Sequence, residues 1–163
     1  MKKTEFAYIA GIVDGEGSIG ITRPMSFCSK KQTRGTGKRP DVVERNKKGH
    51  EKGAIRCPYV QVSVANTNEW LIHWLHFNFG GSIYCEQPGK NPLSKRACWR
   101  WNITNKKAAE FLKLVLPYLK IKQEQAELAI LFQSNKIPSK KVTDEQRAVE
   151  ETQRLIMVHH NKH

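Results

Sequence analysis

The sequence predicts a single α+β domain in which two hairpins form one curved, four-stranded antiparallel sheet. Apolar and polar residues alternate at 58–65 and 97–103, which is typical of half-buried strands. Apolar residues recur at helical spacing on either side of these segments, and glycines or prolines separate them. The expected order is helix, strand, strand, helix, strand, strand and three helices, an αββαββα core with additional C-terminal helices.

The first helix is expected to follow Thr4, a good N-cap, and to end at the glycines of 14–17. The first strand then runs from 18 to about 27. In the second strand, 58–65, three valines share the core face and the polar side chains lie on the opposite face. The outward-facing residues are Tyr59, Gln61 and Ser63.

The second helix begins after Thr67 or Asn68 and ends at Gly80-Gly81, and the second hairpin pairs 82–86 with 97–103. Its outward-facing residues should be Ser82, Tyr84, Glu86, Arg100 and Asn102. Trp99 and Trp101 then face the helices. The opposite phase, which would expose both tryptophans for stacking on single-stranded nucleic acid, stays open.

Three helices complete the chain. The first follows Thr104-Asn105 and ends at Pro117, and the next opens at Leu119 and runs to about Phe132. A C-terminal extension, 133–163, contains the last helix, which opens at a capping box of Thr143 and Gln146 and runs to about Val158. We expect this helix to brace the domain from outside.

The charge of the chain indicates a polyanionic partner. Lys and Arg number 28 against 15 acids, a formal net charge of +13. Eleven of these basic residues lie between Arg23 and Arg56 against three acids, so a long basic connection, 31–56, should join the first two strands. This connection either contacts phosphates or is a disordered, solvated loop.

The chain lacks an apolar run long enough to span a membrane and a signal-peptide pattern at its start. We therefore expect an intracellular protein of a prokaryotic cytoplasm or organelle matrix, with no membrane partner and no organic cofactor. The four cysteines form no C-x-x-C pair and are expected to be reduced, although a Cys85–Cys98 bridge is conceivable. His73 and His76 are expected to be packing or surface residues rather than metal ligands.

The first helix combines small residues with two acids at its C-terminal end. Ala7, Gly11 and Gly15 share one face, and interior glycines are costly unless a second helix approaches closely. A second copy of the chain would supply that helix, with an interface of Ala7, Ala10, Gly11, Asp14 and Gly15. Carboxylates are repelled at a helix C-terminus unless a cation compensates, so Asp14 and Glu16 indicate a metal site.

This segment has two competing interpretations. Residues 15–20 spell G-x-G-x-x-G, but β-branched residues and Pro24 follow where a dinucleotide-binding fold needs a helix. A buried helix that ends in a glycine cap with solvated acids stays open.

The segment Ile9-Ala10-Gly11-Ile12-Val13-Asp14-Gly15-Glu16-Gly17 resembles the LAGLIDADG motif of homing endonucleases. The resemblance implies that this helix forms the seam of a homodimer. It also implies that Glu16 and the main-chain carbonyl of Gly15 hold Mg²⁺, or Mn²⁺, with Ca²⁺ as a non-cleaving substitute. Family members more often carry Asp at the position of Glu16.

The segment Leu119-Lys120-Ile121-Lys122-Gln123 also resembles this family, which implies that Lys122 lies beside the scissile phosphate. Many relatives place Gln and Arg after the second strand to order water near the metal. Here 64–69 contains no arginine, so Gln61, Asn66 and Asn68 are the candidates for that role.

The resemblance implies a site-specific endonuclease that cuts both strands of a long, nearly palindromic target across the minor groove and leaves 3′ overhangs. Whether an intron or an intein encodes it stays open, and the compact length favours an intron-encoded protein. Outward strand residues and the basic connection would bind the duplex. The DNA-binding candidates are Thr22, Arg23, Ser26, Lys30, Lys31, Arg34, Arg56, Tyr59, Gln61, Ser63, Tyr84, Glu86, Arg100 and Asn102. The alternative is a catalytically silent relative that acts as an intron RNA maturase or a DNA-binding regulator.

Overall fold

The computed structural model describes residues 1–23, 57–87, 96–137 and 142–162. The described helices and strands follow the predicted order and are α1 (Lys3–Glu16), β1 (Gly17–Thr22), β2 (Tyr59–Asn66), α3 (Glu69–Phe79), β3 (Ser82–Glu86), β4 (Cys98–Thr104), α4 (Asn105–Val115), the 3₁₀ turn η1 (Leu116–Tyr118), α5 (Gln123–Ser134) and α6 (Asp144–His160). All of them belong to one unit, Met1–Thr22 with Pro58–His163. The expected basic connection, 31–56, lies outside the described residues.

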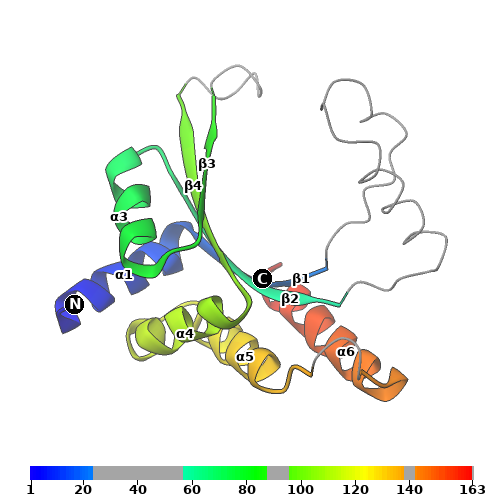
Figure 1. Cartoon of the computed structure of the whole chain (residues 1–163). Helices are drawn as coiled ribbons and strands as arrows, with labels where there is room; N and C mark the ends of the chain where they lie inside the picture. Colours follow the sequence, from blue (N-terminus) through cyan, green and yellow to red (C-terminus); the bar gives the residue numbers. More distant parts are fainter. Residues whose placement is uncertain (24–56, 88–95, 138–141, 163) are drawn as a thin grey trace, which may run out of the picture. The chain divides into compact units, whose positions relative to one another are not determined.

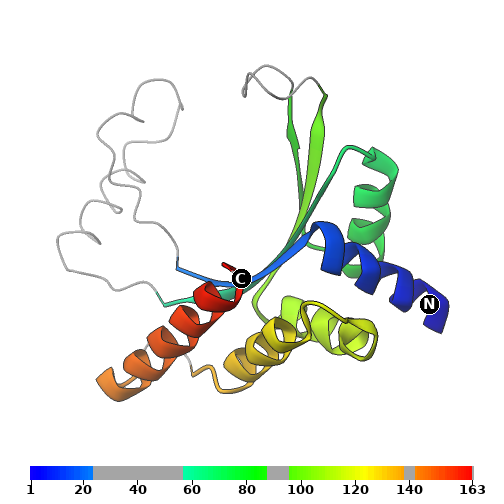
Figure 2. The same cartoon turned by 180° about the vertical axis from the view of Figure 1, so that it is seen from behind.

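The predicted α+β class and the curved antiparallel sheet are confirmed. The strand order is β1-β2-β4-β3, and every neighbouring pair is antiparallel (Figure 1). The register aligns Ile19 with Val62 and Val62 with Ile103, so these apolar side chains share one face. The helices pack on this face, and Figure 2 shows the same arrangement from behind.

The predicted phase of the second hairpin is also confirmed. Trp101 is completely buried, and its indole N–H donates to the carbonyl oxygen of Gly80 at 2.7 Å. Trp101 also packs edge-on against Phe111, and Trp99 packs against His73. The opposite phase, with both tryptophans available for stacking, is therefore wrong, because the packing of two helices against β4 decides the orientation.

Several helix boundaries differ from the sequence-based expectation. The N-cap of α1 is Lys2 rather than Thr4, because the Glu5 carboxylate accepts the backbone N–H of Lys2 and the helix starts earlier. Asn68 caps α3, and Thr143 and Gln146 form the predicted capping box of α6. The helix expected to open at Leu119 instead begins at Gln123. No helix in the described part of the chain is long and apolar enough to cross a membrane.

Gly81 sits where the chain turns from α3 into β3. Its φ is +94°, and a Cβ at this position would overlap the carbonyl oxygen of Asn102. We expect Gly81→Ala to lower the free energy of unfolding by about 2 kcal/mol, because it adds left-handed strain and pushes β3 away from β4. Chemical denaturation measures the loss. Gly20→Ala is the matched control, since its Cβ would meet only the Thr22 hydroxyl at 3.7 Å; an equal loss in both variants would contradict the explanation.

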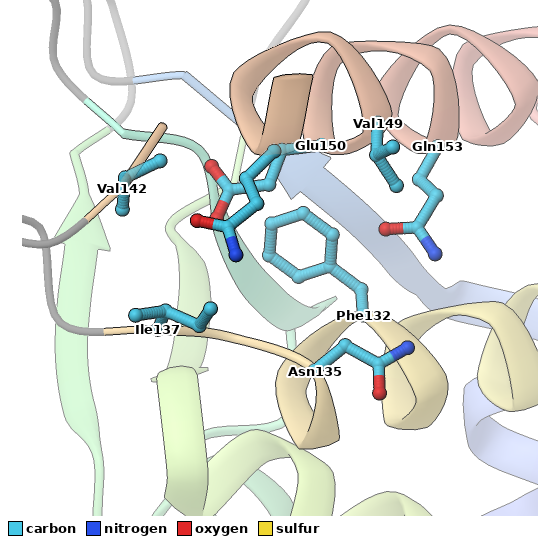
Figure 3. Close-up of a pocket in the computed structure, with 8 residues that line it drawn as sticks. Phe132, Asn135, Ile137, Val142, Val149, Glu150 and Gln153 are labelled. Carbon is cyan, nitrogen blue, oxygen red and sulfur yellow. The ribbon is translucent and has the colours of Figure 1, made fainter. Parts of the chain in front are cut away.

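A pocket of ≈ 230 Å³ lies between α5 and α6. Figure 3 shows Phe132 and Glu150 pointing into it from the two helices. Glu150 is 9% exposed, and one of its carboxylate oxygens is buried without a hydrogen-bond partner. None of the candidate site residues lines this pocket, so it lies apart from the candidate site.

Candidate functional site

The helix α1 passes directly into β1 with no loop between them. A Cβ on Gly17 would lie 2.7 Å from both the Cα and the carbonyl oxygen of Val13, so only glycine allows this close approach to the last helical turn. The Gly17 N–H donates to carbonyl oxygens of the last helical turn. The Glu16 side chain is exposed at this junction of helix and strand.

Asn66 holds the Glu16 carboxylate. Its side-chain amide donates a short hydrogen bond to Glu16 Oε2, and its own Oδ1 accepts the Asn68 N–H at 2.7 Å. The Asn68 side chain in turn accepts the Leu71 N–H at 3.3 Å and caps α3. The start of α3 therefore fixes the orientation of Asn66, and Asn66 fixes that of Glu16. Asn68 itself acts as a helix cap here.

Gln61 does not belong to this cluster. It pairs with Gly20, four residues beyond Glu16 along β1, which corresponds to a separation of about 13 Å. Its side-chain amide donates to Asn102 in the middle of the sheet at 3.3 Å. The assignment of Gln61 to a catalytic group beside Glu16 is corrected, because the register places it among the outward-facing strand residues instead.

Lys122 caps the C-terminal end of α1. Its ammonium donates to the carbonyl oxygens of Val13, Asp14 and Gly17 at 2.9, 2.7 and 2.7 Å. Since a lysine has three N–H donors, the ammonium is fully engaged. Burial lowers the pKa of Lys122 from its ordinary value, and the charge of Asp14 opposes this shift. The family resemblance implies that Lys122 lies beside the scissile phosphate, and this position stays a prediction.

Asp14 completes this clamp from the other side. Its two carboxylate oxygens accept the backbone N–H groups of Lys120 and Lys122 at 2.8 and 3.0 Å. These contacts hold the segment before α5 in a non-helical conformation, which explains why α5 starts later than expected. They also show that Asp14 is engaged within its own chain. Lys122 is therefore the cation that compensates the negative end of α1 beside Asp14.

The predicted interface face of α1 is exposed in part. Ala7, Gly11 and Gly15 are exposed, and a Cβ on either glycine would meet no atom within 4 Å. We call these three residues the glycine face. Ala10 is completely buried, so its assignment to the interface is corrected. It belongs to the core cluster, where α1 packs against β1, β2, α4 and η1.

The outward face of the sheet carries the predicted polar residues. Tyr84 pairs with Arg100, and Ser63 pairs with Asn102, so these side chains lie side by side. The Arg100 guanidinium lies 3.7 Å from Glu86, and its Nε has no hydrogen-bond partner. Ser63 is only 8% exposed, which leaves it little surface for a contact.

The edge of this face is described only in part. Thr22 and Tyr59 form the last pair of β1 and β2, and Arg23 follows directly. The remaining DNA-binding candidates, Ser26, Lys30, Lys31, Arg34 and Arg56, lie outside the described residues. Cys85 and Cys98 are free thiols, so the conceivable bridge between them is absent.

Solved structures show which fold this is. The homing endonuclease I-CvuI, in complex with a DNA target, matches with a TM-score of 0.66 and 18% identity over 97% of this chain and 82% of that chain. The archaeal intron-encoded homing endonuclease I-Vdi141I, complexed with DNA, matches with a TM-score of 0.66 and 13% identity over 98% of this chain and 86% of that chain. This chain has the LAGLIDADG homing-endonuclease fold. No protein-family model and no curated protein matches the sequence.

The match in fold agrees with the motif at 9–17, because that segment forms the helix α1 and its junction with β1. Sequence reasoning missed the clamp that Asp14 and Lys122 form across more than a hundred residues. The only signal for it was the pairing of an acid and a lysine in two segments that both resemble the family. Sequence spacing carries no information about such a distant contact.

Proposed function

We propose that this protein is a site-specific, divalent-metal-dependent DNA endonuclease that acts as a homodimer. In this proposal it hydrolyses both strands of a long, nearly palindromic duplex across the minor groove and leaves 3′ overhangs. The observation that carries the proposal is the exposed Glu16 carboxylate, which Asn66 orients at the end of a helix whose neighbouring glycine face is open. The fold shared with DNA-bound homing endonucleases supports it.

The donor chemistry at Glu16 fits a hard divalent cation. Carboxylate and main-chain carbonyl oxygens are the ligands that Mg²⁺ prefers, and Glu16 with the carbonyl of Gly15 would supply them. Among the described residues no group of three or more His, Cys, Asp or Glu side chains converges, so one subunit offers an incomplete site. Glu16 of a second subunit and phosphate oxygens would complete it. When bound, Mg²⁺ or Mn²⁺ lowers the pKa of an attacking water and stabilises the entering and leaving oxygens.

The chain's own residues have separate roles in this proposal. Glu16 would bind the cation, and Asn66 orients the Glu16 carboxylate. The second N–H of the Asn66 amide would be the donor to an ordered water. Asn68 positions Asn66 through its backbone N–H. Lys122 holds the helix end rigid, and its charge lies close enough to the junction to favour a developing negative charge there.

The outward face of the sheet supplies specificity. Antiparallel strands fit the major groove, where base edges differ in their donors and acceptors. The Arg100 side chain is partly exposed, so its terminal N–H groups offer donors to guanine, and the amides of Gln61 and Asn102 offer donors and acceptors to adenine. Tyr84 is 56% exposed on the same face. Basic residues of 23–56 would contact phosphates, which positions the protein without discriminating sequence.

Selection from a randomised duplex library tests the function. Purified protein is incubated with the library and Mg²⁺, and the cut ends are sequenced. We expect one long, nearly palindromic consensus, cut on both strands with 3′ overhangs, and no cutting when Ca²⁺ replaces Mg²⁺. The absence of any enriched cut site in both Mg²⁺ and Mn²⁺ would refute the proposal.

One observation favours a catalytically silent relative. All three donors of the Lys122 ammonium are bound to carbonyl oxygens of α1 and β1, so this cation is not free for a phosphate in the described structure. A silent relative would act as an intron RNA maturase or a DNA-binding regulator. Tight, metal-independent binding of structured intron RNA without DNA cutting would identify that function.

A further inference from the structure

The helix α3 is apolar on both sides. Leu71, Ile72 and Leu75 are buried against the sheet. On the opposite side, Trp70, Trp74 and Phe77 follow one another at spacings of four and three residues, so they form one stripe. Trp70 is 66% exposed and Phe77 is 88% exposed. A helix that is hydrophobic all round is normally buried, yet nothing in the described part of the chain covers this stripe.

The stripe continues onto α1. Trp70 and Trp74 stack with ring centroids 6.0 Å apart, and the Tyr8 ring meets Trp74 edge-on at 6.3 Å. Tyr8 is 57% exposed and follows Ala7 of the glycine face. The two helices lie side by side in both views (Figures 1 and 2). Tyr8, Trp70, Trp74 and Phe77 therefore form an aromatic patch that adjoins the glycine face.

The glycine face alone offers too little area for a stable dimer. Specific interfaces bury about 1,200–2,000 Å² in total, and glycine and alanine side chains contribute almost none of it. A buried tyrosine, tryptophan or phenylalanine contributes about 150–250 Å². In a two-fold interface each residue counts twice, so the aromatic patch supplies the apolar area that the glycine face lacks.

The charge of α3 argues against nucleic acid as the occupant. Its sequence, Glu69 to Phe79, contains no Lys or Arg, and Glu69 carries a negative charge in its first turn. Binding to a polyanion draws most of its affinity from cations near phosphates. Exposed aromatics on a helix without Lys or Arg therefore fit an apolar protein surface, and tyrosine and tryptophan are enriched in such interfaces.

We propose that the aromatic patch is the outer part of a subunit interface and that a second copy of this chain covers it. The proposal rests on the homodimer of the proposed function and extends the interface from the glycine face to α3. In this arrangement the glycines set how closely the two α1 helices approach. This distance in turn sets the separation of the two Glu16 carboxylates. The aromatic rings supply most of the binding energy.

Sedimentation of the full-length protein at a series of concentrations tests this proposal. The test variant is Trp70→Ser with Phe77→Ser, which changes two exposed side chains and no core residue. We expect its dimer dissociation constant to rise at least about 30-fold, since interface aromatics are frequent hot spots. The control is Leu155→Ser, which removes an exposed apolar side chain, 53% exposed, from α6 and should leave the constant unchanged.

A second variant, Gly11→Leu, separates this proposal from the proposed function. It fills the open space above the glycine face and should dissociate any dimer built on α1. If Gly11→Leu dissociates the dimer and the serine variant does not, the aromatic patch proposal fails while the homodimer stands. If the unchanged protein is a monomer both free and on DNA, the proposed homodimeric function itself fails. A serine variant that stays dimeric but loses DNA binding would place nucleic acid on the patch and also overturn the proposal.

Should the double variant unfold, Phe77→Glu provides the same test alone, because Phe77 is the most exposed of the four side chains. A buried carboxylate pair at a two-fold interface would be strongly unfavourable, so we expect a monomer with an unchanged circular dichroism spectrum. A dimer of unchanged affinity would contradict the proposal.

Discussion

Replacing Glu16 by Gln is expected to reduce DNA cleavage in Mg²⁺ by at least about 100-fold, because metal catalysis contributes several kcal/mol of transition-state stabilisation. Glutamine keeps the length of the side chain and the hydrogen bond from Asn66, but it removes the negative charge that binds the cation. DNA binding should stay within about threefold, since phosphate contacts elsewhere dominate the affinity. Nicking and double-strand cleavage of a selected target are measured alongside binding.

Glu110→Gln is the matched control, since it makes the same change at an exposed position of α4 and should cut normally. Asn66→Ala tests the positioning role in the same assay. It keeps the Glu16 carboxylate but removes the hydrogen bond that orients it. We expect DNA cleavage to fall by about 10–100-fold and the Mg²⁺ concentration needed for cleavage to rise. Full cleavage by Glu16→Gln in Mg²⁺ would refute the assignment of the metal ligand.

The order of helices and strands could be predicted because local patterns determine it. The alternation of Trp99, Arg100 and Trp101 sets one face of β4, and the paired glycines at 80 and 81 end α3. The position of Glu16 at a helix end followed from the same kind of local pattern. These features depend on neighbours within a few residues, which the sequence displays directly.

Features that depend on distant contacts could not be predicted in the same way. Ala10 matched the motif but is buried in the core, because α1 packs against β1, β2, α4 and η1, most of which lie far away in the sequence. The site of Gln61 depends on its register with Gly20, and the sequence did not specify that pairing. The clamp of Asp14 and Lys122 joins residues 108 positions apart. Sequence pattern limits which residues are candidates, and only the packing decides which of them meet.

The role of Lys122 can be separated from catalysis by measuring stability without DNA. Lys122→Met is expected to lower the free energy of unfolding by about 3 kcal/mol, because three carbonyl oxygens at the negative end of α1 lose a charged donor. Methionine keeps an apolar side chain that reaches the ε carbon and removes only the ammonium. Chemical denaturation of the free protein gives the change.

Lys120→Met is the matched control. It removes the same charge two residues away, but the Lys120 side chain is exposed and only its backbone N–H contacts Asp14, so stability should change little. Lys122→Arg should recover part of the loss, because a planar guanidinium keeps the charge but cannot aim three donors at converging carbonyl oxygens as an ammonium does. If Lys122→Met unfolds like the unchanged protein and yet cuts no DNA, the ammonium does not hold α1 in solution, and the phosphate position implied by the family resemblance is the correct one.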